Sequence, residues 1–165
     1  AASDVYKRQD TSLIQCTIYF RYYLNQALKA SGLGDQFLDN LQIWRDQMAL
    51  GLTTWAEMPE PSRSDCHAWG ASPNIEFYRI LLGIDSDAPG FRKIRIAPSL
   101  GKLKEVSGTI PHPLGSVTAV YKLDERGEGT ARLVLPEGTT GIFIWDGKEI
   151  PLKPGEQVIS LSSRH

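Results

Sequence analysis

The feature that most constrains this chain is a change in hydrophobic spacing near residues 87–90, which read Asp-Ala-Pro-Gly. Before this turn-rich stretch, apolar residues recur with the period of an α-helix, and after it short alternating runs are separated by turns. The sequence therefore predicts an α + β chain of several parts, with helices in residues 10–86 and a β domain in residues 87–165. Residues 1–9 join the helical pattern abruptly and are interpreted as a non-native lead-in.

Three segments before the turn show helical patterns. Residues 10–32 are apolar on more than one face and end at Gly32, which predicts a helix buried on most sides. Residues 35–50 are amphipathic, and residues 73–83 begin with proline at the first turn of a predicted helix. The apolar residues of the second segment are spaced along one face: Phe37, Leu41, Trp44 and Met48. Helices of this kind need helical neighbours, and they suit a toroid of helical hairpins.

The β domain is predicted from short alternating runs and from turn signals such as Asp146-Gly147. The expected strands are residues 92–97, 104–109, 116–123, 130–135, 141–145 and 157–161. Their alternation gives four core faces, namely Ile94/Ile96, Val117/Ala119/Tyr121, Leu133/Leu135 and Ile142/Ile144. Short antiparallel strands at this spacing predict a β-sandwich. We interpret His112, between two prolines, and Trp145, at a strand end, as structural residues.

Charge and composition exclude several classes of function. The formal net charge is −1 and the sequence has no basic cluster, so we expect no nucleic-acid partner. No apolar run reaches the roughly 18 to 20 residues that span a bilayer, so we expect no membrane partner. Cys16 and Cys66 lie far apart and have no partner at metal-ligand spacing, so neither a metal nor another cofactor is predicted.

The loop TTWAEMPEPSRSDCHAW, residues 53–69, concentrates side chains that suit a sugar site. Tryptophan rings pack on the apolar faces of a pyranose while polar groups bond its hydroxyls. The residues in question are Trp55, Glu57, Glu60, Arg63, Asp65, His67 and Trp69. Structural alternatives stay open: Glu57 as a solvated carboxylate or helix cap, His67 as a structural histidine, and Arg63 with Asp65 as an ion pair bracing the loop.

A glycosidase needs two carboxyl groups on opposite sides of the scissile bond. Glu60 is too close to Glu57 in sequence to form an obvious opposite wall, so the second carboxyl group is expected from elsewhere.

Four stretches in order, TTWAE, SRSDCHAWGASP, FYRILLGI and APGFRKIRIAPSLGKLKEVSGTIPHPLGSV, resemble the C-terminal end of bacterial α-L-rhamnosidases of glycoside hydrolase family 78. The resemblance implies the last helices of a catalytic (α/α)6 toroid followed by a C-terminal β-sandwich. It also implies inverting hydrolysis of terminal α-L-rhamnosyl residues from a rhamnose-containing glycoside or polysaccharide. Glu57 resembles the general base, with Glu60 as the fallback, and the general acid has no counterpart in these residues.

The same resemblance gives Trp55, His67 and Trp69 roles in binding the sugar, and Arg63 joins them as a substrate-binding residue. One departure is Ala56, because many members have the tryptophan and the glutamate adjacent. We expect the isolated chain to be inactive and the parent enzyme to be periplasmic or extracellular, with a cytoplasmic location still open. The alternatives are a non-catalytic β-sandwich scaffold, a carbohydrate-binding module, or a barrel glycosidase acting on another sugar.

Overall fold

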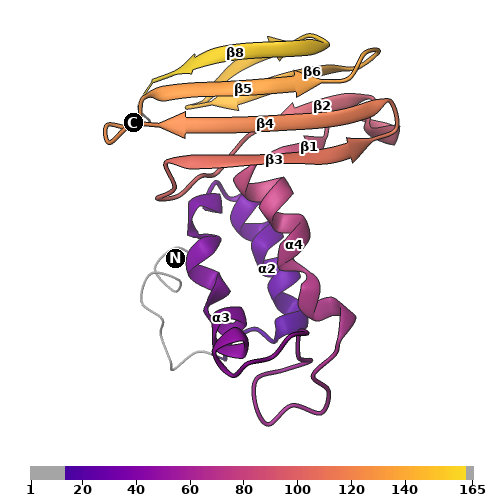
Figure 1. Cartoon of the computed structure of the whole chain (residues 1–165), viewed down its shortest axis with the longest axis vertical. Coiled ribbons are helices and arrows are strands. Elements are labelled where there is room, and N and C mark those ends of the chain that lie inside the picture. Colours follow the sequence, from indigo (N-terminus) through magenta and orange to yellow (C-terminus); the bar gives the residue numbers. More distant parts are fainter. Residues whose placement is uncertain (1–13, 163–165) are drawn as a thin grey trace. The chain divides into compact units, whose positions relative to one another are not determined.

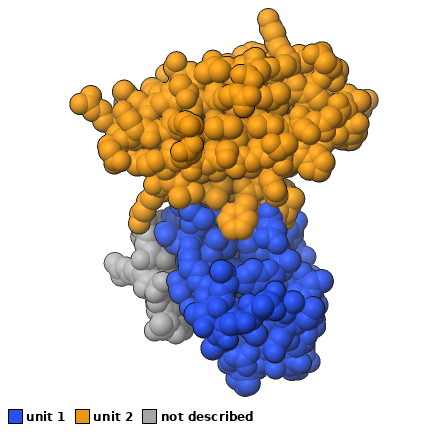
Figure 2. All heavy atoms as spheres, viewed as in Figure 1, with its two compact units in different colours: residues 1–74 blue, residues 75–165 orange. Residues whose placement is uncertain are grey.

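The chain is described by a computed structural model that covers residues 14–162. It divides into two compact units, residues 1–74 and residues 75–165 (Figure 2). The described part of the first unit is built from helices, and the second unit contains two β-sheets (Figure 1). The predicted α + β fold class is thus confirmed, whereas the lead-in assigned to residues 1–9 lies outside the described residues.

Helix α2 (Ile18–Ala30) begins and ends with local capping groups. The Thr17 hydroxyl accepts a hydrogen bond from the backbone N–H of Phe20 at 3.3 Å, which satisfies one free donor of the first turn. At the other end Gly32 has a φ of 75°, and the N–H of Leu33 donates to the Leu28 carbonyl at 2.8 Å. The predicted stop at Gly32 is therefore confirmed.

The side chains of α2 are more exposed than its apolar sequence predicts. Tyr19, Phe20 and Tyr23 are 44%, 58% and 51% exposed, while Ile18 and Leu28 are buried. The helix packs along one side on two short 3₁₀ turns, η1 (Gly34–Gln36) and η3 (Ala68–Ala71). Packing within this chain thus covers one side of the helix and leaves three aromatic rings exposed, and burial of its other sides by neighbouring helices stays a prediction.

The second predicted helix is interrupted. Residues 35–50 form η1, the 3₁₀ turn η2 (Leu38–Leu41) and the shorter helix α3 (Gln42–Ala49). Three of the four residues of the predicted apolar face, Phe37, Leu41 and Trp44, are buried, whereas Met48 is 63% exposed and Gln47 beside it is buried.

The third predicted helix contains α4 (Pro73–Glu76) and continues as the π-helix η4 (Phe77–Leu81). Its last residues are tied to the sheets, because Leu82 lies in their core and the Ser99 N–H donates to the Ile80 carbonyl at 2.9 Å. The compact units accordingly divide between residues 74 and 75. Where the domains of a longer parent enzyme divide stays a prediction.

The second unit contains eight strands in two sheets, and Figure 1 shows the two layers that these sheets form. They are β1 (Ile84–Ser86), β2 (Lys93–Ile96), β3 (Glu105–His112), β4 (Gly115–Leu123), β5 (Gly129–Leu135), β6 (Thr140–Trp145), β7 (Lys148–Leu152) and β8 (Gly155–Leu161). One sheet has the order β1-β2-β6-β7 and the other β3-β4-β5-β8. The six predicted strands are all present. Strands β1 and β7 were not predicted, since β1 has three residues and β7 contains Pro151, which weakens a strand signal.

One pairing in the sandwich differs from the antiparallel prediction. Strand β2 pairs with β6 in parallel, with Ile94 opposite Gly141. The chain leaves the first sheet after β2, forms three strands of the second sheet and then returns beside β2 in the same direction. The remaining strand pairs are antiparallel.

The core lies between the two sheets and contains three of the four predicted faces. Ile94, Ile96, Val117, Ala119, Tyr121, Leu133 and Leu135 are all buried in it. The fourth face is wrong: Phe143 and Trp145 point inward instead of Ile142 and Ile144. The sequence Gly-Ile-Phe-Ile-Trp is apolar at nearly every position, so alternation alone does not tell which of its side chains face the core. The pairing of Gly141 with the inward-facing Ile94 decides which side chains of β6 face the core.

His112 joins the turn after β3 to the turn before β2. Its Nδ1 accepts a hydrogen bond from the Leu114 N–H at 3.1 Å, so its Nε2 carries the proton and donates to the Phe91 carbonyl at 2.8 Å. Phe91 has a φ of 58°, an unusual value for a residue other than glycine. The buried histidine therefore holds a strained turn, which agrees with its interpretation as structural.

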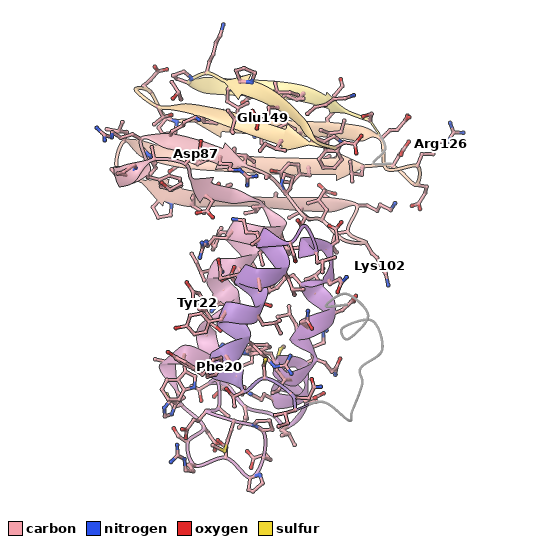
Figure 3. All side chains as sticks on the ribbon, turned by 180° about the vertical axis from the view of Figure 1, so that it is seen from behind. Phe20, Tyr22, Asp87, Lys102, Arg126 and Glu149 are labelled. Atoms are coloured by element: carbon pink, nitrogen blue, oxygen red, sulfur yellow. The ribbon has the colours of Figure 1, made fainter. Side chains whose placement is uncertain are left out.

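We expect His112→Ala to lower the free energy of unfolding by about 2 kcal/mol, because two partly buried hydrogen bonds are lost. Urea denaturation followed by circular dichroism measures this change. Arg126→Ala is the control, since Arg126 projects from the β4–β5 turn (Figure 3) and its removal is expected to cost less than about 0.5 kcal/mol. Equal stability of the two variants would contradict a clamping role for His112.

Candidate functional site

The loop of residues 53–69 is a two-armed structure held by backbone hydrogen bonds. The Glu57 N–H donates to the Ser64 carbonyl at 2.9 Å, and the His67 N–H donates to the Trp55 carbonyl at 2.8 Å. The Thr54 hydroxyl adds a bond to the carbonyl of the opposite arm. The two arms thus lie side by side, and they bring residues that are ten or more positions apart in sequence into one site.

Helix α3 and the turn η3 anchor these arms. The Ala56 N–H donates to the buried Gln47 side chain at 2.9 Å, and the Trp44 indole N–H donates to the Gly70 carbonyl at 2.7 Å. A Cβ added at Gly70 would lie 2.5 Å from the Cβ of Trp55, so only glycine allows this approach. Gln47 and Gly70 were missed from the sequence, although a glutamine on an otherwise apolar helix face is a usable signal.

Ala56, the residue that separates Trp55 from Glu57, has a clear structural place. Its side chain is buried, and its N–H points to helix α3, while the backbone groups of its two neighbours bond to the opposite arm. This alternation is typical of an extended segment. The additional residue therefore carries the contact that fixes the loop to the helix.

Glu57 is held by Arg63. The guanidinium donates through Nε to Glu57 Oε2 at 3.1 Å and through Nη2 to Oε1, forming a bidentate ion pair. The Glu57 side chain is 8% exposed, whereas that of Arg63 is 75% exposed. The Arg63 hydrogen bond lowers the pKa of Glu57 below its ordinary value, and the charges of Arg63 and His67 add to this effect, while burial opposes it. Glu57 is therefore ionised at neutral pH.

Glu60 and Asp65 lie differently from Glu57. Both are exposed, and Glu60 Oε2 accepts a hydrogen bond from the Ser62 N–H at 3.2 Å. The alternative interpretation, an ion pair between Arg63 and Asp65 that braces the loop, is wrong, because Arg63 pairs with Glu57 instead. The shape of the loop decides this, since its two arms place residue 57 rather than residue 65 opposite the guanidinium.

The aromatic side chains of the loop are only partly brought together. The rings of His67 and Trp69 have centroids 4.1 Å apart, and Trp69 also meets the ring of Tyr19 at 5.5 Å. Trp55 is half-buried, with its Cβ close to Gly70. The site thus contains one ionised carboxylate, one guanidinium and a partly exposed aromatic wall, which are the groups that a neutral sugar site uses.

Within residues 14–162, no group of histidine, cysteine or acidic side chains could hold a metal ion. No described helix is long and apolar enough to cross a membrane. The aromatic residues on the strands, Tyr121, Phe143 and Trp145, are buried, so the strands present no aromatic platform for a sugar.

The fold places this chain in the α + β class, with helices that precede a two-sheet β-sandwich. Residues 83–156 match the family model described as "Bacterial alpha-L-rhamnosidase C-terminal domain". Residues 83–156 are thus similar to the C-terminal domain of these enzymes, and the resemblance stated from the sequence is confirmed. A comparison with curated proteins found no match.

Solved structures agree with this assignment at the level of the fold. The chain is similar to an α-L-rhamnosidase from Aspergillus terreus, with a TM-score of 0.77 and 20% identity over 85% of this chain and 18% of that one. For an α-L-rhamnosidase from Dictyoglumus thermophilum the TM-score is 0.70, with 18% identity over 86% and 17%. For a GH78 family rhamnosidase from Bacillus sp. GL1 it is 0.62, with 22% identity over 82% and 15%. The chain spans less than a fifth of the length of these proteins.

Proposed function

We propose that this chain is the C-terminal part of an inverting α-L-rhamnosidase. In this proposal the helical segment completes an (α/α)6 toroid with helices from the rest of the enzyme, and the loop of residues 53–69 supplies one side of the active site. The observation that carries the proposal is an ionised Glu57, fixed by Arg63 beside the rings of His67 and Trp69. The similarity to rhamnosidases supports rhamnose as the sugar.

The chemistry assigned to Glu57 is general base catalysis. Its carboxylate takes a proton from a water molecule as the water oxygen attacks the anomeric carbon from the face opposite the leaving group. The glycosidic C–O bond breaks, and a carboxylic acid from elsewhere in the enzyme protonates the departing oxygen. Inversion requires room for the water, with the two carboxyl groups about 6.5 to 9.5 Å apart. Trp55, His67 and Trp69 form the wall that faces the sugar.

Hydrolysis by the full-length protein tests this proposal. A panel of 4-nitrophenyl glycosides should show hydrolysis of the α-L-rhamnoside, and proton NMR should detect β-L-rhamnose before the anomers equilibrate. Release of the α anomer first would exclude inversion. Preferential hydrolysis of another glycoside would assign the site to a different sugar and favour the alternative of a barrel glycosidase with other specificity.

Arg63 is proposed to position Glu57 and to keep it ionised. In the full-length protein we expect Arg63→Gln to raise the pKa of Glu57, because the largest cause of the lowered value is removed. A base works only when ionised, so the acidic limb of kcat/KM should move to higher pH. A pH profile from about 3 to 8 measures the shift. If KM rises and the acidic limb stays in place, Arg63 instead contacts the sugar directly.

A further inference from the structure

The aromatic wall of the site continues beyond the loop onto helix α2. The centroids of His67 and Trp69 are 4.1 Å apart, those of Trp69 and Tyr19 are 5.5 Å apart, and those of Tyr19 and Tyr23 are 5.8 Å apart. Tyr19 and Tyr23 lie one helical turn apart on the same side of α2. The rings therefore form a continuous line from the proposed sugar wall to the first turns of the helix.

The two tyrosines present polar groups at the far end of this line. Their hydroxyl oxygens are 3.3 Å apart, and this hydrogen bond is the main reason that the pKa of Tyr23 is raised above its ordinary value. Both side chains are exposed, by 44% and 51%. The surface thus combines aromatic carbon with two neighbouring hydroxyl groups.

Such a surface fits a sugar better than an apolar helix. An apolar helix packed over Tyr19 and Tyr23 would remove both hydroxyls from water and offer them no new partner, which costs free energy. A pyranose ring offers C–H groups to the rings and adjacent hydroxyls to the phenol oxygens. Neighbouring Phe20 is 58% exposed (Figure 3), and its ring lies 5.6 Å from that of Tyr19 and 5.8 Å from that of Tyr23, between centroids.

We propose that Tyr19 and Tyr23 bind the sugar residue to which the rhamnosyl group is attached. This inference rests on the proposed function, because it places the rhamnosyl group beside His67 and Trp69. The next sugar of the chain then lies on the tyrosine pair, further along the same row of rings. The site is in this way specific for rhamnosyl oligosaccharides over rhamnosides of small alcohols.

Two substrates separate this role from a structural one in the full-length protein. Tyr19→Ala should raise KM about tenfold for an α-L-rhamnosyl-glucose disaccharide and leave methyl α-L-rhamnoside, which lacks a second ring, within about twofold. The double variant Tyr19→Phe/Tyr23→Phe keeps the rings, and should raise KM for the disaccharide alone by about threefold to fivefold. Tyr78→Ala, which removes an exposed tyrosine from the other unit, is the control.

Equal losses on both substrates, or no loss on either, would overturn the inference. Saturation-transfer NMR of the disaccharide on the full-length protein gives a readout that does not depend on turnover. If the protein hydrolyses no α-L-rhamnoside, the proposed function fails. In that case loss of the glucose-ring signal in Tyr19→Ala would still support the tyrosine surface, and an unchanged signal would refute it.

Discussion

Replacing Glu57 by glutamine in the full-length protein is expected to lower kcat on 4-nitrophenyl α-L-rhamnoside by about a thousandfold. General base catalysis contributes roughly 10²- to 10⁴-fold, and the amide of glutamine cannot accept a proton from water. The amide has nearly the shape of the carboxylate and leaves the sugar wall in place, so KM should stay within about threefold. Steady-state kinetics give both values.

Glu60→Gln is the matched control for this experiment. Glu60 is the other carboxylate of the same loop, but it is exposed and accepts a hydrogen bond from the Ser62 N–H. Its replacement should change kcat by no more than about threefold. If Glu60→Gln abolishes turnover and Glu57→Gln does not, Glu60 is the base and Glu57 serves only to hold Arg63.

A large loss of stability is expected from Gly83→Ala. Gly83 has a φ of 72°, and an added Cβ would lie 2.2 Å from the carbonyl carbon of Ala97 and 2.3 Å from the nitrogen of Pro98. These are backbone atoms next to β2, so neither can move without shifting the strand. We expect a loss of more than about 3 kcal/mol in the free energy of unfolding of the sandwich, beyond the ordinary cost of the left-handed conformation.

Gly147→Ala separates the steric clash from the backbone conformation. Gly147 has the same φ of 72°, but an added Cβ would meet nothing within 4 Å. Its replacement should cost only about 1 kcal/mol, which is the conformational term. Hydrogen exchange of the amides in β4 and β5 reports the stability of the sandwich in each variant of the chain. Similar losses for the two variants would show that the close approach of Gly83 to Ala97 contributes nothing.

Parts of the sandwich were predictable because they follow from local spacing. Strand β4 alternates Val117, Ala119 and Tyr121 with less buried residues, and this pattern identifies both the strand and its inner face. Strand β6 lacks such a pattern, because nearly every position is apolar, and its inner face was assigned wrongly. Which side chains of β6 face the core depends on its parallel pairing with β2, a contact between residues some 47 positions apart.

The helical segment shows the same division. The start of α2 after Thr17 was not predicted, whereas its stop at Gly32 was, because a glycine with positive φ is a local signal. The interruption before α3 was missed, since the amphipathic spacing of residues 35–50 also fits one continuous helix. The exposure of Tyr19 and Tyr23 is a property of what packs on α2, which no spacing along the helix specifies.

For the candidate site, the sequence by itself determined the chemical groups, which are the carboxylates and aromatic side chains of one loop. It also determined that a β domain with a recognisable motif follows this loop. The three-dimensional structure decided how these groups are paired. It placed Arg63 on Glu57 rather than Asp65, and it joined Trp69 to Tyr19 on a distant helix. The physical reason is that hydrogen-bonded loop arms and packed helices create contacts between residues far apart in the chain, whereas the sequence pattern records only local preferences.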